Sequence, residues 1–313
     1  MSEQNRLGVF KTYKLYVGGK FPRSESGRVY EVTTKTSGAG AAGKGAWLAN
    51  VPQSSRKDAR DAVVAARKAF GGWSGATAYN RGQVLYRVAE MLEGRKEQFV
   101  REVAASEGLS KSKAAAVVDA AIDRWVWYAG WTDKIGQISG GANPVAGPFF
   151  NLSTPEPTGV VAVLAPQKSS LLGLVSVIAP VIATGNTAVV IASADAPLPA
   201  LSLGEVLATS DVPGGVVNIL SGATAELAAP LAAHQDVNAI DLTGAGAELA
   251  KELEIAAADN LKRVLRPLPA EADGSDASAD WLAAPGTHRL TAFLETKTVW
   301  HPTGALGASG SSY

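Results

Sequence analysis

Short apolar runs alternate with segments of helical period from Gly159 onward. The apolar runs are expected to be strands, and they begin near Val160, Thr187, Val216, Ala239 and Leu261. The segments between them are expected to be helices, over residues 171–183, 198–209, 225–233 and 247–258. Because the strand runs contain almost no polar residue, both faces of the sheet should be buried, which is typical of parallel sheets. The pattern predicts an α/β fold with a doubly wound parallel sheet and helices on both faces.

Residues 1–135 follow another pattern, with short strands first and amphipathic helices afterwards. Residues 13–32 predict strands around a Gly-Gly turn. The first helix is expected to begin at Ser54 or Ser55, the second at Asn80 and the third at Ser110 or Ser112. The second should continue after Arg95 and stop at Gly108. The tryptophan-rich end of the third helix, residues 125–131, is interpreted as core rather than as a ligand cage, because its aromatic residues recur at helical spacing.

The pattern is lost after residue 266 and returns near Leu290. Residues 267–286 are rich in small and acidic residues and are interpreted as a linker in which Trp281-Leu282 is a candidate anchor. The segment from Leu290 to Pro302 contains Thr296, Thr298 and Val299, which favour a strand. We therefore expect a unit over 1–266, with a helical part at 1–135 and a sheet part at 155–266. The linker and a final strand with a mobile tail at 287–313 follow.

Charge and composition restrict the function classes. The chain is 46% hydrophobic and 19% charged, as in soluble globular proteins. Residues 1–150 hold 22 basic and 13 acidic residues, and residues 151–313 hold 7 and 16. Two halves of opposite net charge favour docking of one half on the other or contacts in an oligomer. Neither a nucleic-acid partner nor a membrane partner is expected. The start of the chain has no apolar core of a signal peptide, and the longest apolar run, residues 171–185, is too short to cross a bilayer, so we expect a cytoplasmic protein.

The chain contains no cysteine, which excludes disulfides, thiolate metal sites and a cysteine nucleophile within it. Its three histidines lie far apart in the sequence, without the spacing of metal ligands. No metal site is expected.

Ligands in doubly wound sheets bind outside the carboxyl ends of the strands, so the turns there are the candidate site. The first turn contains Pro166 and Lys168, and Lys168 is either an anion ligand or a solvated surface residue. The second contains Asp195, which could accept a ribose hydroxyl or cap the next helix. The fourth contains Gly244 in a Gly-x-Gly turn, which by itself is weak evidence for a dinucleotide.

Several motifs in the same order resemble the aldehyde dehydrogenase superfamily over nearly the whole chain. They are the opening segment 13–32, residues 61–74 (DAVVAARKAFGGWS), residues 156–161 (EPTGVV), residues 179–180 (AP) with 185–187 (GNT), residues 213–218 (PGGVVN), residues 242–244 (LTG) and residues 293–302 (FLETKTVWHP). The resemblance implies a Rossmann-like NAD-binding-type domain. It also implies that the last strand is the one with which family members oligomerise.

The resemblance fails at the family's functional positions. After the first strand the family usually has Pro-Trp-Asn, but here Gln167 and Lys168 follow Pro166, so the oxyanion-binding amide is missing. After the second strand Ala192 replaces the usual lysine, and Asp195 is a shortened acid. In the fourth turn Ala245 stands for the usual serine and Leu249 for a glycine. Pro267-Leu268-Pro269 stands where the general-base glutamate is expected. In the family the nucleophilic cysteine lies in a catalytic domain after this position, and the chain is expected to lack that domain because too few residues follow.

These departures lead to the hypothesis of a non-catalytic subunit without a catalytic residue, a pseudoenzyme. It would associate with an active aldehyde dehydrogenase through the strand from Leu290 to Pro302 and form or regulate a hetero-oligomeric complex. No cofactor is expected in that case. In the main alternative, weak NAD(P) affinity persists through Pro166, Asp195 and Gly244, in a sensor or in a residual oxidoreductase acting on aldehydes. A third hypothesis is an enzyme of different chemistry that uses Lys168.

Overall fold

The centre of the molecule is a five-stranded parallel sheet in the order β7-β6-β5-β8-β9. The structure, a computed structural model, describes residues 9–35, 45–266 and 280–304. The strands are β5 (Val160–Leu164), β6 (Thr187–Ile191), β7 (Val217–Leu220), β8 (Ala239–Asp241) and β9 (Arg263–Leu265). Within this sheet the chain first forms the central strand β5, continues outward through β6 to β7, and then crosses to the other side of β5 to form β8 and β9. The prediction of a doubly wound parallel sheet is confirmed.

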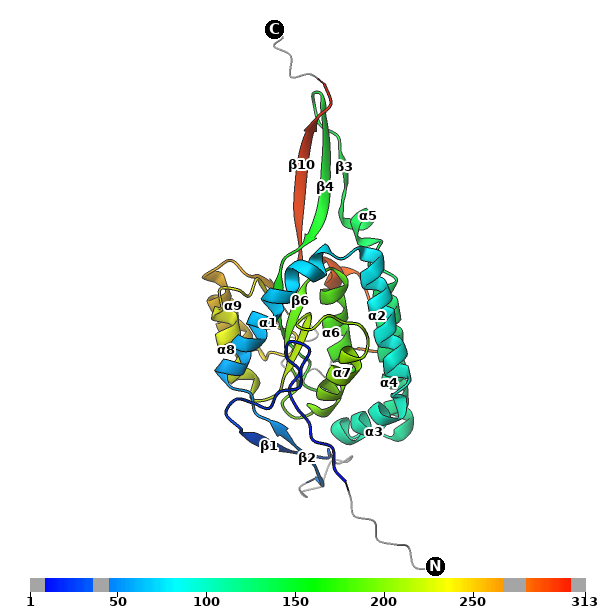
Figure 1. Cartoon of the computed structure of the whole chain (residues 1–313), viewed down its shortest axis with the longest axis vertical. Helices are drawn as coiled ribbons and strands as arrows, with labels where there is room; N and C mark the ends of the chain where they lie inside the picture. Colours follow the sequence, from blue (N-terminus) through cyan, green and yellow to red (C-terminus); the bar gives the residue numbers. More distant parts are fainter. Residues whose placement is uncertain (1–8, 36–44, 267–279, 305–313) are drawn as a thin grey trace, which may run out of the picture.

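Helices cover both faces of this sheet (Figure 1). One face packs against α6 (Leu172–Ala183) and α7 (Leu198–Ala208). The other packs against α1 (Arg56–Gly75), α8 (Thr224–Ala233) and α9 (Ala247–Ala258). Because side chains alternate along a strand, β5 supplies Val161 and Val163 to the first core and residues 160, 162 and 164 to the second. Every residue of β5 and β6 is buried, as their uninterrupted apolar sequences predict.

Four further helices stand on the α6 side or beside it: α2 (Ala78–Glu93), α3 (Lys96–Glu107), α4 (Lys111–Ala129) and α5 (Ile135–Ser139). The predicted N-caps of α1, α2 and α4 agree with the structure in part. Ser55 caps α1 with a complete capping box, and Ser110 caps α4. The prediction of Asn80 as a cap is wrong, because Thr77 caps α2 and accepts a hydrogen bond from the Asn80 N–H at 3.2 Å. Trp125 and Tyr128 are buried in the core, as expected.

The chain around Tyr16 attaches to the edge of the central sheet. Gly18 and Gly19 have φ of 61° and 77°, and Val17 and Lys20 exchange backbone hydrogen bonds across them. Before this turn, Tyr16 pairs with Ile219 of β7, so the segment extends the sheet at that edge. Farther along, β1 (Val29–Thr33) and β2 (Trp47–Pro52) form a separate antiparallel ribbon.

A three-stranded antiparallel sheet projects away from this body (Figure 1). It has the order β10-β4-β3 and consists of β3 (Gly141–Asn143), β4 (Phe149–Pro157) and β10 (Leu294–Pro302). We call it the arm. The sequence predicts β10 but not β3 and β4. The predicted start of the last strand at Leu290 is wrong, because Leu290 lies buried in the short helix α10 (His288–Thr291) and the strand begins at Leu294.

Two smaller expectations near the linker need comment. The fifth strand begins at Arg263 and not near Leu261, because Leu261 has a φ of 56° and a 91% exposed side chain. Trp281 packs against the core and Leu282 is exposed, so only the first of the two is an anchor. Residues 267–279 of the expected linker and 305–313 of the expected tail lie outside the described residues. In the described ranges, no helix is long and apolar enough to cross a bilayer.

Candidate functional site

The turn after β5 is joined to the turn after β6 by the side chain of Gln167. Its amide nitrogen donates to the Ala165 carbonyl oxygen at 2.8 Å, and its amide oxygen accepts from the Ala194 N–H at 3.1 Å. Ser193 Oγ donates to the Gln167 carbonyl oxygen at 2.8 Å. Pro166, which precedes the glutamine, is buried. The glutamine therefore links the first two turns of the candidate site into one hydrogen-bonded unit.

The N-terminus of α6, a position where α/β folds often bind phosphate, holds a carboxylate of the protein itself. Glu107 Oε1, from the end of α3, accepts hydrogen bonds from Ser170 N at 2.7 Å and Ser170 Oγ at 2.6 Å. Burial raises the pKa of Glu107, and the two hydrogen bonds oppose that rise. Lys168 lies exposed in the same turn. An external anion at this helix end would have to displace the Glu107 carboxylate.

Asp195 lies exposed beyond the carboxyl end of β6. Burial raises the pKa of Tyr30, and the charge of Asp195 raises it further. The alternative role of Asp195 as a helix cap is wrong, because α7 has Pro197 at its N-cap and no side-chain cap bond. Asp195 is thus available at the edge of the sheet.

Gly244 has a packing role in the fourth turn. Its N–H donates to the Leu164 carbonyl oxygen at 2.9 Å, which holds the turn against the end of β5. A Cβ atom at this position would lie 2.0 Å from the carbonyl oxygen of Ala165. The fold therefore requires a glycine here whether or not a cofactor binds.

A buried ion pair at the end of β8 escaped the sequence analysis. Arg289 donates to Asp241 Oδ2 at 3.0 Å and to Thr243 Oγ1 at 3.0 Å, and both charged side chains are less than a tenth exposed. Asp241 Oδ1 accepts from the N–H and the hydroxyl of Thr243. No pattern of spacing indicates that two residues 48 positions apart will meet. The pair joins the segment after the expected linker to the central sheet.

A second buried arginine strengthens this junction. Arg124 of α4 donates to Ser176 Oγ at 2.7 Å and to the carbonyl oxygens of Trp281 and Ala283 at 2.8 and 3.0 Å. The guanidinium of Arg289 lies 5.7 Å from the centre of the Trp281 ring. Burial is the main cause that lowers the pKa of Arg124, and nearby Arg289 adds to it. These contacts give Trp281 its anchoring position.

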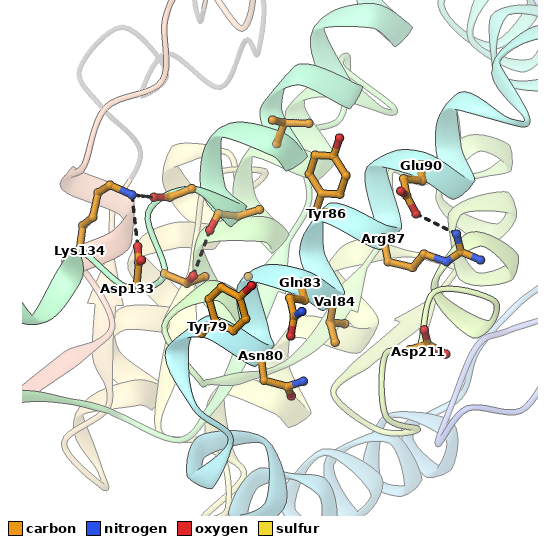
Figure 2. Close-up of a pocket in the computed structure, with 15 residues that line it drawn as sticks. Tyr79, Asn80, Gln83, Val84, Tyr86, Arg87, Glu90, Asp133, Lys134 and Asp211 are labelled. Atoms are coloured by element: carbon orange, nitrogen blue, oxygen red, sulfur yellow. Dashed lines mark hydrogen bonds and ion pairs between the residues drawn. The ribbon is translucent and has the colours of Figure 1, made fainter.

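A cavity of about 760 Å³ lies away from these turns, between α2 and α4. Figure 2 shows Tyr79 and Tyr86 projecting from α2 beside it. Of its charged side chains, Arg87 pairs with Glu90 at 2.8 Å and Lys134 with Asp133 at 3.2 Å, and Asp211 also lines the cavity. In the described part of the chain, no group of histidine, aspartate or glutamate side chains could hold a metal ion.

The predicted site residues come together only in part. The turns of Pro166 and Asp195 are linked through Gln167, and the turn of Gly244 contacts the end of β5. Among the described residues of these turns, Asp195 and Lys168 are the exposed charged groups. A carboxylate and an ammonium group can bind a polar ligand or transfer a proton. Pro267, the position expected for a general base, lies outside the described residues.

Comparisons with known proteins agree on one family. The profile of the aldehyde dehydrogenase family matches residues 36–275. The chain is 32% identical over 269 residues to a putative aldehyde dehydrogenase DhaS of Bacillus subtilis (84% of this chain, 52% of that protein). It is 34% identical over 263 residues to retinal dehydrogenase 2 of Gallus gallus (81% and 48%).

The solved structure of an aldehyde dehydrogenase from Bacillus cereus in complex with NAD+ superimposes with a TM-score of 0.74 at 27% identity, covering 81% of this chain and 50% of that one. The chain thus spans about half the length of the curated relatives it matches. Its α/β fold is that of the NAD-binding part of these proteins. Because one family profile matches most of the sequence and the fold agrees, the chain belongs to the aldehyde dehydrogenase family.

Proposed function

We propose that this chain is a non-catalytic subunit that associates with an active aldehyde dehydrogenase and forms or regulates a hetero-oligomeric complex. The observation that carries the proposal is the arm. Its strand β10 lies at the edge of the β10-β4-β3 sheet, and its outer edge has no strand partner in the described residues. Phe150, Val299 and Trp300 expose 48%, 44% and 57% of their surface on it. An exposed strand edge with large apolar side chains is suited to pairing with another chain.

The absence of a nucleophile supports the non-catalytic part of the proposal. The chain has no cysteine, so it supplies no thiolate that could attack an aldehyde. In this proposal residues 267–286 replace the catalytic domain. The hydrogen bonds from Arg124 to the Trp281 carbonyl oxygen and from the buried Arg289 to Asp241 hold the end of this segment and the chain after it against the body of the protein. The arm then keeps its position although the catalytic domain is absent.

The arm residues provide the first test. A tagged chain should co-purify with an aldehyde dehydrogenase from the same cells, and replacing Val299 and Trp300 together by aspartate should abolish this. Charged side chains on the arm would have to lose their hydration in the interface, which is unfavourable. The matched control is Tyr79→Asp, since Tyr79 is 70% exposed on α2, and it should leave co-purification unchanged. If the chain never co-purifies with such an enzyme, the partner proposal is wrong.

The alternative function is NAD(P) sensing, and the exposed Asp195 at the end of β6 is the observation that favours it. Our proposal expects that NAD and NADP do not raise the melting temperature through the turns around Asp195, because Gln167 and Glu107 already accept hydrogen bonds from the Ala194 N–H and from the N–H and hydroxyl of Ser170. A bound ligand present at 100 times its Kd would raise the free energy of unfolding by about 2.7 kcal/mol. A rise in melting temperature that disappears in Asp195→Ala would favour the sensor. NADH formation from an aldehyde by the purified chain would contradict the non-catalytic proposal and favour a residual oxidoreductase.

A further inference from the structure

We propose that a cavity on the outer face of the β1–β2 ribbon binds a nucleoside monophosphate, separately from the turns at the carboxyl edge of the sheet. The cavity has a volume of about 400 Å³, within the range of small-molecule sites. Its walls are residues 10–13, residues 23, 24 and 27–29 of the next turn, and Trp47, Asn50 and Pro52 of β2. We call it the ribbon cavity.

The register of the ribbon explains why the cavity forms on this side. Val29 is paired with Pro52, and these residues with Asn50 belong to one face. The opposite face carries Val32 and Val51, which are buried in the core. Residues 10–13 then run past the outer face and close the cavity from the other side.

The charge of the ribbon cavity is entirely positive. Lys11, Arg23 and Arg28 line it, and none of its lining residues is acidic. The charge of Lys11 is compensated from outside the cavity, because its Nζ lies 3.0 Å from a Glu205 carboxylate oxygen. Arg23 and Arg28 form no ion pair with any other residue of the described ranges. Two guanidinium groups without a carboxylate partner are suited to a phosphate, which can accept several of their hydrogen bonds.

Aromatic side chains supply the second half of the recognition. Phe10 and Trp47 meet edge to face, with ring centres 5.3 Å apart and planes at 82°. Both line the cavity, and they are 70% and 44% exposed. The indole N–H of Trp47 points toward Asn50 Oδ1 at 3.4 Å, which helps to orient the ring. A planar base can stack on such a ring while its phosphate reaches the arginines.

Isothermal titration of the whole chain with AMP, adenosine and inorganic phosphate tests the proposal. AMP should bind, and adenosine and phosphate should each bind at least about tenfold more weakly, because each retains one half of the contacts. The AMP affinity should also fall as salt is added, since screening weakens the contacts of exposed arginines. If AMP binds no more tightly than phosphate, or does not bind, the proposal is wrong.

Variants locate the binding. Arg23→Gln with Arg28→Gln should weaken AMP binding by at least about tenfold and leave the melting temperature unchanged, because both side chains are exposed. Trp47→Ala should weaken it by a similar factor. Arg87→Gln, on α2, is the control and should bind AMP normally. AMP binding that survives the loss of both arginines would overturn the proposal. NAD contains an AMP moiety, so it could bind in the ribbon cavity as well. A rise in melting temperature with NAD that persists in the double arginine variant but is lost in Asp195→Ala would show binding at the turns after the strands instead.

Discussion

Replacing Arg289 by methionine is expected to lower the free energy of unfolding by about 3–5 kcal/mol. The methionine has a similar volume but cannot pair with Asp241, whose side chain is 1% exposed and would remain charged in the interior. Thr243 would still donate to that carboxylate, but the guanidinium contributes the charge that offsets its burial. Urea denaturation measures the loss, and hydrogen exchange of α10 should show the loosened segment.

The chain offers a matched control for this change. Arg263 and Glu295 also join the sheet to the segment after the linker, with an Nε–Oε1 distance of 2.6 Å, but they are 42% and 52% exposed. Arg263→Met should therefore cost only about 0–1 kcal/mol. The double variant Asp241→Val/Arg289→Met should recover part of the loss, because no buried charge is left alone. Equal losses in Arg263→Met and Arg289→Met would contradict the role assigned to the buried pair.

The second large effect is expected from Gly244→Ala. The new methyl group would lie 2.0 Å from the Ala165 carbonyl oxygen, which is backbone and cannot rotate away. The turn must then move, and the hydrogen bond from Gly244 N to Leu164 O at 2.9 Å would lengthen or break. Overpacking of this kind costs about 1–3 kcal/mol, and backbone movement makes the upper end the expected value. Thermal or urea denaturation measures it.

Gly246 in the same turn is the control, because a Cβ there meets nothing within 4 Å. Gly246 is the N-cap of α9, so Gly246→Ala should cost about 1 kcal/mol or less through the weaker cap. A neutral Gly244→Ala variant would show that the turn can shift freely. In that case the glycine would need another explanation, such as close approach of a ligand.

The central sheet could be predicted from the sequence because each of its elements has a local signal. The apolar runs at Val160 and Thr187 have the length and composition of buried strands, and the structure places β5 and β6 there. The fifth strand begins two residues after its expected start near Leu261, because Leu261 adopts a left-handed conformation that its sequence does not indicate.

Two strands of the arm, β3 and β4, could not be predicted in the same way. In β4, Asn151 is buried while Phe150 is half exposed, so the usual relation between polarity and burial is inverted. Asn151 can be buried because its side-chain oxygen accepts a hydrogen bond from Asn143 at 2.6 Å. That partner comes from β3, and only the three-dimensional pairing supplies it.

The candidate site shows the same division. The turns of Pro166, Asp195 and Gly244 lie where the strand ends place them, but their roles depend on contacts from distant residues. Glu107 reaches the first turn from a helix 63 positions earlier in the chain, and Arg289 reaches β8 from 48 positions later. Residue type and spacing do not encode such meetings, because they arise from the packing of whole elements.

The pairing of β4 with β10 also constrains the order in which the molecule can form. Ser153 and Thr298, hydrogen-bonded at 2.9 Å across the arm, are 145 positions apart. Closing so long a loop is slow. The edge of β4 that pairs with β10 is therefore expected to stay unpaired until the central sheet has formed. During synthesis the arm is therefore expected to be among the last parts to assemble. If the arm binds another chain, as proposed above, that association can begin only after the central sheet has formed.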